Sequence, residues 1–425
     1  MIDGKSPSEP GYKDGTTNAL CTTGKCQPPV SPCKKAKDDD DKLSAALKGR
    51  MKGSDGEMMF PAGLSYCKEQ EYTLTPTFNR FNKYRKALPY ARAASDVNRL
   101  KDAADDGQSK KACLTRLPDT GEALCKELGL PKGTISDADL RNDKTGFRAA
   151  IYRSEADGKL ILVARDTQPH SLVDWKTNTD NGQGKDTDQY IAMRQLAGKL
   201  DKKGVPFDVA GYSKGGGLAQ EAGLIANKAK VYIFNSSGLP DAALGYTGNK
   251  SFASLESRTV SYSSEGDFLT YMNNTTDPAQ QLVNARYLRN RLAEEPVSFE
   301  KDKRTPIAIG YRSPELKATD EKNIPQEFKD AKSAYINELD KMIKGAEDKQ
   351  KRGESFRLFP PAHFREHITI DNSSTITGNT FGAGKNEPNV GKLNQHKMEN
   401  VIDPLEKNLK ADREMLQKFL KECPG

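Results

Sequence analysis

The stretch that decides the fold is FDVAGYSKGGGLAQEAG, residues Phe207–Gly223. A short apolar run ends at Tyr212, and Ser213 follows in a glycine-rich turn that leads into residues favouring a helix. A serine on a sharp turn between a strand and a helix exposes its hydroxyl above the sheet, beside backbone N–H groups that can stabilise a developing oxyanion. The stretch therefore predicts Ser213 as a catalytic nucleophile.

The glycines around this serine are predicted to have separate roles. Such a turn is crowded, so Gly211 and Gly215 leave room for it, while Gly216 and Gly217 let the helix start close to the sheet. A phosphate-binding turn is disfavoured, because neither GxxxxGK[ST] nor GxGxxG occurs in this stretch.

Strand and helix patterns alternate on both sides of the serine. Two β-rich runs joined by a tight connection come first, and buried strands then alternate with helices, which is typical of a parallel sheet. Residues 166–188 between them are predicted to form a loop. We therefore expect an α/β fold, a mostly parallel α/β-hydrolase-like sheet flanked by helices. The strands are expected at 146–154, 159–165, 206–213, 230–238 and 258–264, and the helices at 189–204 and 215–229.

Composition shifts divide the chain into three predicted regions. Residues 1–55 are rich in polar residues and glycine and contain the acidic run Asp38–Asp41, so we expect a flexible tether. Residues 56–144 are predicted to form an N-terminal helical region, split into two helices at Pro89. Residues 145–425 are the predicted hydrolase domain, with a charged helical insertion at about 276–350 and a long amphipathic helix at the end.

The bulk composition excludes several classes of protein. The 425 residues carry a net charge of +7, but basic and acidic residues are interspersed, and no nucleic-acid-binding motif stands out. No apolar run approaches the about 20 residues that cross a bilayer, and the first residues lack the apolar core of a Sec signal peptide. We therefore expect neither a nucleic-acid partner nor a transmembrane segment.

The seven cysteines lack the paired spacing of a zinc site. Most precede the serine motif, so a structural role is expected, and Cys113 and Cys125 are candidates for a bridge. Disulfides would suit a protein that works in an oxidising compartment.

A nucleophilic serine needs an acid and a histidine, which follow it in that chain order in α/β-hydrolases. Asp267 stands just past a strand that follows the nucleophile helix, which is where the acid is expected, and Asp174, Asp241 and Glu265 are weaker rivals. The chain has four histidines, of which His170 precedes the serine and is disfavoured by order. The residues alone leave His363, His367 and His396 open.

From about residue 146 to the end, the sequence resembles class 3 lipase-like α/β-hydrolases, especially bacterial phospholipases and secreted antibacterial lipase effectors. The blocks that carry the resemblance are GFRAAIYRSEADGKLILVARDT, DWKTNTDNGQG, QYIAMRQLAGKL, VAGYSKGGGLAQEAGLIA, VYIFNSSGL, YSSEGDFLT and LNQHKMENVI. The resemblance implies Ser213 as nucleophile, Asp267 as orienting acid and His396 as base, with His367 and His363 as alternatives.

The resemblance also implies an oxyanion hole formed by the backbone N–H groups of Thr167 and Lys214. Asp166 stands where the family usually has glycine, which places a carboxylate near the expected oxyanion. The Lys214 side chain is expected either to bind an anionic headgroup or to be solvated. A family motif at Asp174, Trp175 and Asn178 is expected to brace the active-site loop.

The expected function is hydrolysis of carboxyl esters in membrane phospholipids through an acyl-enzyme, without cofactor or metal. The resemblance further suggests a toxin exported by a type VI secretion system to a target-cell membrane, or otherwise a cytoplasmic protein, with an immunity protein and a component of the secretion apparatus as partners. A neutral lipase or carboxylesterase, and a non-catalytic binding module on a decayed hydrolase fold, are the alternatives.

Overall fold

The computed structural model describes residues 21–22, 25–26, 31–51, 65–98, 113–167, 171–248, 251–294, 299–300, 305–306, 326–370 and 398–424. Its centre is an eight-stranded sheet in the order β12-β9-β8-β7-β6-β5-β3, with β4 paired to β5. Strands β6, β7, β8, β9 and β12 are parallel, while β5 is antiparallel to β6 and β3 to β5. The sheet strands are β3 (Leu114–Arg116), β4 (Arg141–Asn142), β5 (Phe147–Ser154), β6 (Leu160–Ala164), β7 (Phe207–Tyr212), β8 (Val231–Phe234), β9 (Thr259–Ser264) and β12 (Glu366–Ile370). The predicted α/β fold with a mostly parallel sheet is confirmed.

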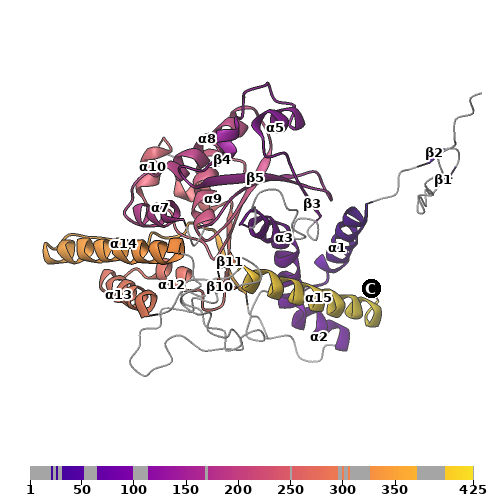
Figure 1. Ribbon diagram of the computed structural model, residues 1–425. Coiled ribbons are helices and arrows are strands. Elements are labelled where there is room, and N and C mark those ends of the chain that lie inside the picture. Colours follow the sequence, from indigo (N-terminus) through magenta and orange to yellow (C-terminus); the bar gives the residue numbers. More distant parts are fainter. Residues whose placement is uncertain are drawn as a thin grey trace, which may run out of the picture.

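Helices cover both faces of this sheet (Figure 1). Strands β6 and β8 are buried along their whole length, as expected for parallel strands between two helical layers. One face carries α3 (Thr75–Asn98) and α15 (Glu399–Glu422), and the other carries α8 (Asp188–Lys202), α9 (Lys214–Ile225) and α11 (Phe252–Glu256). The remaining helices are α1 (Pro32–Lys48), α2 (Tyr66–Thr73), α5 (Gly121–Glu127), α6 (Asp137–Leu140), α7 (Leu172–Gly182), α10 (Ala242–Tyr246), α12 (Phe268–Asn274), α13 (Pro278–Glu294) and α14 (Gln326–Lys351).

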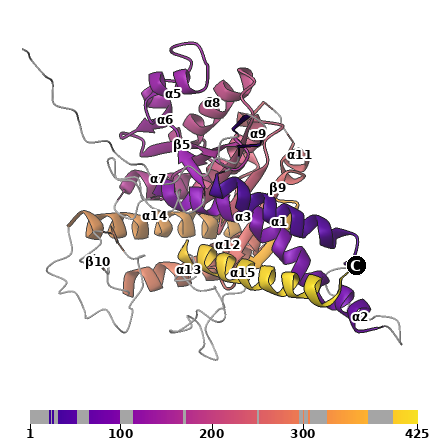
Figure 2. The ribbon, with the colours of Figure 1, turned by 90° about the vertical axis from the view of Figure 1, so that its right-hand side faces the viewer.

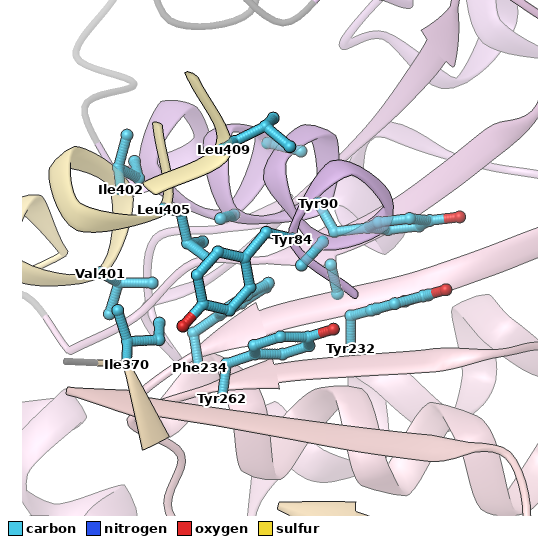
Figure 3. Packing of buried hydrophobic residues seen from close by; sticks show 14 of the residues in the cluster. Tyr84, Tyr90, Tyr232, Phe234, Tyr262, Ile370, Val401, Ile402, Leu405 and Leu409 are labelled. Atoms are coloured by element: carbon cyan, nitrogen blue, oxygen red, sulfur yellow. The ribbon is translucent and has the colours of Figure 1, made fainter. Parts of the chain in front are cut away.

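Helix α3 is one continuous helix, so the prediction that Pro89 divides it is wrong. A proline inside a helix removes one backbone hydrogen bond, but here the helix is held by its buried face. Tyr84 and Tyr90 pack on the sheet strands, and the Tyr90 ring stacks on Tyr232 of β8 with centroids 3.8 Å apart. Figure 3 shows this packing and the side chains of α15 that complete the cluster. The helix that was expected in the N-terminal helical region therefore forms part of the layer that covers the sheet.

The predicted tether contains a packed helix, α1, which corrects that prediction for residues 32–48. Its Leu43 and Leu47 are buried in the same apolar cluster as α3 and α15. The acidic run is not simply solvated: Asp40 accepts two hydrogen bonds from Arg413 of α15, and Asp41 pairs with Arg85 of α3. Figure 2 shows α1, α3 and α15 alongside one another. The remainder of residues 1–30, except the two short strands β1 (Cys21–Thr22) and β2 (Lys25–Cys26), lies outside the described residues.

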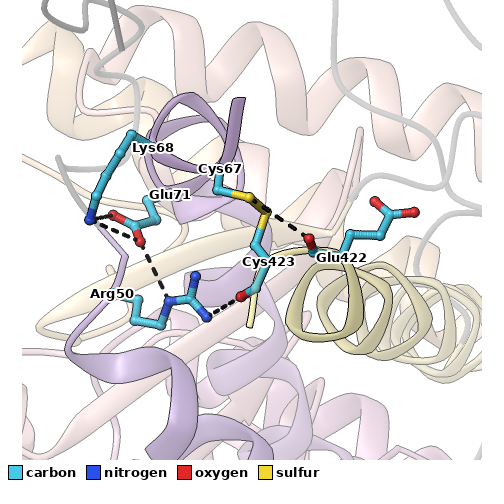
Figure 4. Close-up of a disulfide and its surroundings, with 6 residues drawn as sticks. All are labelled: Arg50, Cys67, Lys68, Glu71, Glu422 and Cys423. Carbon is cyan, nitrogen blue, oxygen red and sulfur yellow. Dashed lines mark hydrogen bonds and ion pairs between the residues drawn. A yellow bond between two sulfur atoms is a disulfide. The ribbon is translucent and has the colours of Figure 1, made fainter. Parts of the chain in front are cut away.

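Two disulfides join segments that are distant in the sequence. Cys33 of α1 is bonded to Cys113, and Cys67 of α2 to Cys423 at the end of α15 (Figure 4). The expected bridge between Cys113 and Cys125 does not exist, because Cys125 is a free thiol buried against Ile135.

The charged helical insertion is present as α13 and α14, which pack against each other, and α14 also packs on α7. Short strands β10 (Phe299–Glu300) and β11 (Thr305–Pro306) pair between them. In the described part of the chain, no helix combines the length and the apolar character needed to cross a membrane.

Candidate active site

Ser213 stands at the turn between central strand β7 and helix α9. Its backbone has φ 53° and ψ −123°, a conformation that residues other than glycine seldom adopt. Holding a non-glycine residue there costs about 1–3 kcal/mol, and such strain concentrates at functional sites. The turn is fixed by Ser213 N, which donates to Phe234 O at 3.0 Å, and by Ser213 O, which accepts from Gly216 N and Ser237 N.

Close contacts explain the four glycines around this serine. A Cβ on Gly211 would lie 1.9 Å from Gly215 O, and one on Gly215 would lie 2.5 Å from Ala164 O. A Cβ on Gly216 would meet the Ser236 hydroxyl at 2.2 Å, and one on Gly217 the Tyr190 hydroxyl at 2.3 Å. The first pair makes the turn possible, and the second lets α9 begin against its neighbours.

Asp267 lies three residues beyond the end of β9 and caps α12. Its carboxylate accepts from Thr270 N at 2.7 Å, and the residue is 3% exposed. Because β7, β8 and β9 are parallel neighbours, Ser213 and Asp267 both follow strands at the same edge of the sheet. The three rival acids differ from Asp267 in their surroundings. Asp241 and Glu265 are exposed, and the carboxylate of Asp174 accepts a hydrogen bond from Lys214 Nζ.

His363 and His367 have both ring nitrogens engaged away from Ser213. His367, in β12, contacts the hydroxyls of Ser263 and Ser261 in β9 at 3.0 and 3.1 Å. Burial lowers the pKa of His367, and the charge of Asp267 opposes this shift. His363 precedes β12, and its ring nitrogens contact Glu256 Oε1 at 3.0 Å and Leu239 O at 3.3 Å.

His396 and His170 lie outside the described residues. The first described residue after His396 is Met398, which is buried in the cluster shared by α15 and the sheet. Asn400 O accepts a hydrogen bond from the Ser264 hydroxyl at the end of β9. The start of α15 therefore lies beside the sheet edge that carries Asp267.

The predicted oxyanion loop lies against the start of α9. Thr167 is held by Asn178, whose Nδ2 donates to Thr167 Oγ1 at 3.0 Å, so Asn178 braces this loop as expected. The backbone N–H of Lys214, the second expected donor, donates to Asp166 Oδ1 at 3.0 Å. The carboxylate that replaces the usual glycine thus contacts the predicted oxyanion donor itself.

A search against models of protein families finds a match over residues 91–308, to a phospholipase-like family described as the Tle-like phospholipase domain. The match covers more than half of the chain and includes Thr167, Ser213 and Asp267. The chain belongs to the Tle-like phospholipase domain family. This membership bears out the resemblance to lipase effectors and indicates a lipid-hydrolysing domain. No curated protein matches the chain.

The side chain of Lys214 is buried inside this phospholipase domain. Both expectations for it, contact with a lipid headgroup and exposure to solvent, are therefore wrong. It is 2% exposed, and its Nζ lies 2.5 Å from Asp174 Oδ1 and 2.7 Å from Gln189 Oε1. Burial lowers the pKa of the Lys214 ammonium, and the adjacent carboxylate of Asp174 opposes that shift. A buried lysine is kept charged only by such a partner. The ion pair therefore ties the first residue of α9 to α7, the helix that follows the oxyanion loop.

Helix α7 itself differs from the loop predicted for residues 166–188. Ser171 caps it by accepting from Asp174 N at 3.2 Å. A serine followed three residues later by an acid is a recognised helix-start pattern, so the sequence held a signal for this helix. The Trp175 side chain lies outside the described ones.

Asn235 is a site residue that sequence reasoning missed. It is fully buried with φ 40°, directly after the residue that accepts from Ser213 N. Its Oδ1 accepts from Ser264 N at 2.8 Å, and its Nδ2 donates to Ser264 Oγ at 3.3 Å. Ser264 O in turn accepts from Asp267 N at 3.1 Å, and Ser264 Oγ donates to Asn400 O. Asn235 and Ser264 thus connect the turn at Ser213, the loop at Asp267 and the start of α15.

Among the described residues, no group of three or more histidine, cysteine or acidic side chains is arranged to hold a metal ion.

Proposed function

We propose that this domain hydrolyses carboxyl esters of membrane phospholipids by a serine mechanism, with Ser213 as the nucleophile. The observation that carries the proposal is the strained backbone of Ser213, at φ 53°, between β7 and α9. Nothing in ordinary packing requires a serine rather than glycine at positive φ, whereas a nucleophile gains an exposed hydroxyl and nearby N–H donors there.

In the proposed reaction, Ser213 Oγ attacks the ester carbonyl carbon while its proton passes to His396. The tetrahedral intermediate places its negative oxygen at the N–H groups of Lys214 and Thr167. Collapse breaks the bond to the glycerol oxygen, which takes the proton from His396 and leaves as a lysophospholipid. Water then cleaves the acyl-enzyme in the same way, releasing a fatty acid, while Asp267 keeps the imidazole in one tautomer.

The assignment of His396 as base rests on the placement of its rivals and of its neighbours in the chain. His363 and His367 make other contacts through both ring nitrogens. Asn400, four residues after His396, is hydrogen-bonded to the end of the strand that leads to Asp267.

The setting of the reaction is also a proposal. The family relationship supports a secreted antibacterial effector, carried by a type VI apparatus to the membrane of a target cell. The two disulfides support work in an oxidising compartment outside the cytoplasm. A producing cell would then need an immunity protein to neutralise the enzyme.

The test uses purified protein and vesicles of phosphatidylethanolamine and phosphatidylglycerol, with fatty acid and lysophospholipid measured by mass spectrometry. Ser213→Ala and His396→Ala are expected to lower the rate at least about a thousandfold. His363→Ala and His367→Ala are the matched controls and should retain most activity when normalised to folded protein. Release of glyceride products but not of lysophospholipid would favour a neutral lipase. Equal turnover by Ser213→Ala and the parent would refute the serine mechanism.

A further inference from the structure

Asp166 makes a contact that the proposed mechanism does not use. Its Oδ1 accepts a hydrogen bond from Lys214 N, the N–H that directly follows the proposed nucleophile. In a serine elbow this N–H is a main donor to the oxyanion of the tetrahedral intermediate. The side chain therefore occupies a position that the reaction needs.

The residues on both sides of Asp166 are held by hydrogen bonds. Arg165 N donates to Arg148 O at 2.8 Å, and Thr167 is held by Asn178. Across the contact, a Cβ on Gly215 would lie 2.5 Å from Ala164 O, which shows how closely the loop and α9 approach. With both neighbours held, rotation of the half-buried Asp166 side chain releases the N–H with less movement than a shift of the whole loop.

A carboxylate and an oxyanion cannot share this donor. The N–H has one hydrogen, and two negative charges within about 4 Å repel each other by about 4 kcal/mol near a protein surface. A hydrogen bond from an N–H to a charged carboxylate is also stronger than one to a neutral acceptor. The ester must therefore displace Asp166 before the oxyanion can form.

We propose that Asp166 is a displaceable occupant of the oxyanion hole and that it limits the rate of acylation. This inference rests on the proposed serine mechanism. Removing the carboxylate frees the Lys214 N–H, so acylation becomes faster. A neutral amide still accepts from the N–H but carries no charge, so its effect is intermediate.

The experiment compares Asp166→Gly, Asp166→Asn and the parent on a soluble short-chain nitrophenyl ester. Active sites are counted with a phosphonate that labels Ser213, so that misfolded protein does not enter the rate. We expect kcat/KM per labelled site to rise about tenfold to a hundredfold in Asp166→Gly, which is less than the about hundredfold to thousandfold effect of a whole oxyanion donor because the parent can still displace Asp166. The rise should be smaller in Asp166→Asn. Asp157→Asn, an exposed aspartate in the β5–β6 turn, is the matched control and should leave the rate unchanged.

The outcomes separate the two proposals. An unchanged or lower rate per labelled site in Asp166→Gly would overturn the role of Asp166 while leaving the serine mechanism intact. A rate that persists when Ser213→Ala is combined with Asp166→Gly would overturn the serine mechanism itself.

Discussion

The disulfide between Cys67 and Cys423 is expected to be the larger covalent contribution to stability. It closes a loop with a sequence separation of 356 residues, against 80 for Cys33–Cys113. In the chain-entropy description, these closures lower the entropy of the unfolded chain by about 20 and about 15 cal/mol/K, or about 6 and about 4.5 kcal/mol at 25 °C. Native disulfides contribute about 2–5 kcal/mol, and the longer closure is expected to contribute more than the shorter one.

The local structure gives the longer bridge further support. Arg50 Nη1 donates to Cys423 O at 2.7 Å, and Arg50 also pairs with buried Glu71 of α2 (Figure 4). These contacts and the bridge together hold the end of α15 against α2. Losing the bridge should therefore expose the last turn of α15 first, while the rest of the helix stays packed on α3.

The assay is urea unfolding without reductant, followed by circular dichroism, with hydrogen exchange to locate the change. Replacing Cys67 and Cys423 together by serine should lower the unfolding free energy by about 4 kcal/mol. Replacing Cys33 and Cys113 together should lower it by about 3 kcal/mol. The difference of about 1 kcal/mol arises because the two closure entropies differ by 1.5R times the logarithm of the ratio of loop lengths. Exchange should rise most in residues 419–423 of the first variant. A larger loss in the second variant, or an unchanged midpoint in the first, would refute this reasoning.

Three further predictions concern buried polar groups. Asn235→Ala removes both side-chain hydrogen bonds to Ser264 and should lower kcat on a soluble ester about tenfold to a hundredfold with little change in KM. Steady-state kinetics measures the two constants separately, and an unchanged kcat would contradict this role of Asn235. Lys214→Met removes the ammonium that neutralises the buried carboxylate of Asp174 and should cost about 3–5 kcal/mol in urea unfolding, much of it recovered when Asp174→Leu is added. Burial raises the pKa of Glu221 from 4.5 to about 7, so the folded protein keeps a proton that the unfolded chain has lost and becomes less stable as pH rises through this interval. Glu221→Gln cannot titrate at this position, so it lacks this loss of stability. The difference in unfolding free energy between Glu221→Gln and the parent should change by about 3 kcal/mol between pH 4 and pH 8. A difference that stays constant with pH would contradict the raised pKa of Glu221.

The sequence predicts the sheet and the serine turn well because both depend on local patterns. A run such as Leu160–Ala164 is apolar throughout and reads as a strand buried on both faces, as observed. The glycines near Ser213 are adjacent in the chain to the turn that they serve, so their spacing alone carries the information.

Contacts between distant segments account for the errors. Pro89 is a local signal for a helix break, but the packing of α3 on the sheet outweighs it. The polar character of residues 32–48 suggests a tether, but the segment forms a packed helix because Leu43 and Leu47 are buried and because Asp40 and Asp41 pair with Arg413 and Arg85. The partner of Cys113 is 80 residues away, where spacing carries no information.

In the candidate site, too, local sequence patterns reveal some residues, while contacts between distant segments decide the others. Ser213 and Asp267 follow strands whose order the sequence indicates, so both could be proposed from pattern. The partners of Lys214 could not, because a lysine at the first position of a helix reads as exposed until Asp174 is known to lie beneath it. The role of Asn235 is equally hidden, since an asparagine after a strand reads as a turn residue, and its bonds to Ser264 depend on the neighbouring strand.

The family match ends before the folded domain does, and the segment beyond the match contributes to the proposed mechanism. The match ends at residue 308, but β12 extends the sheet beside β9 and α15 covers the same face as α3. The bond from Ser264 to Asn400 ties α15 to the strand that leads to the proposed acid, and the Cys67 bridge ties its far end to α2. A fragment limited to residues 91–308 would expose the face that α15 buries and would lack the proposed base. The proposed site therefore depends on segments from both ends of the chain, although the proposed nucleophile and acid lie in the middle.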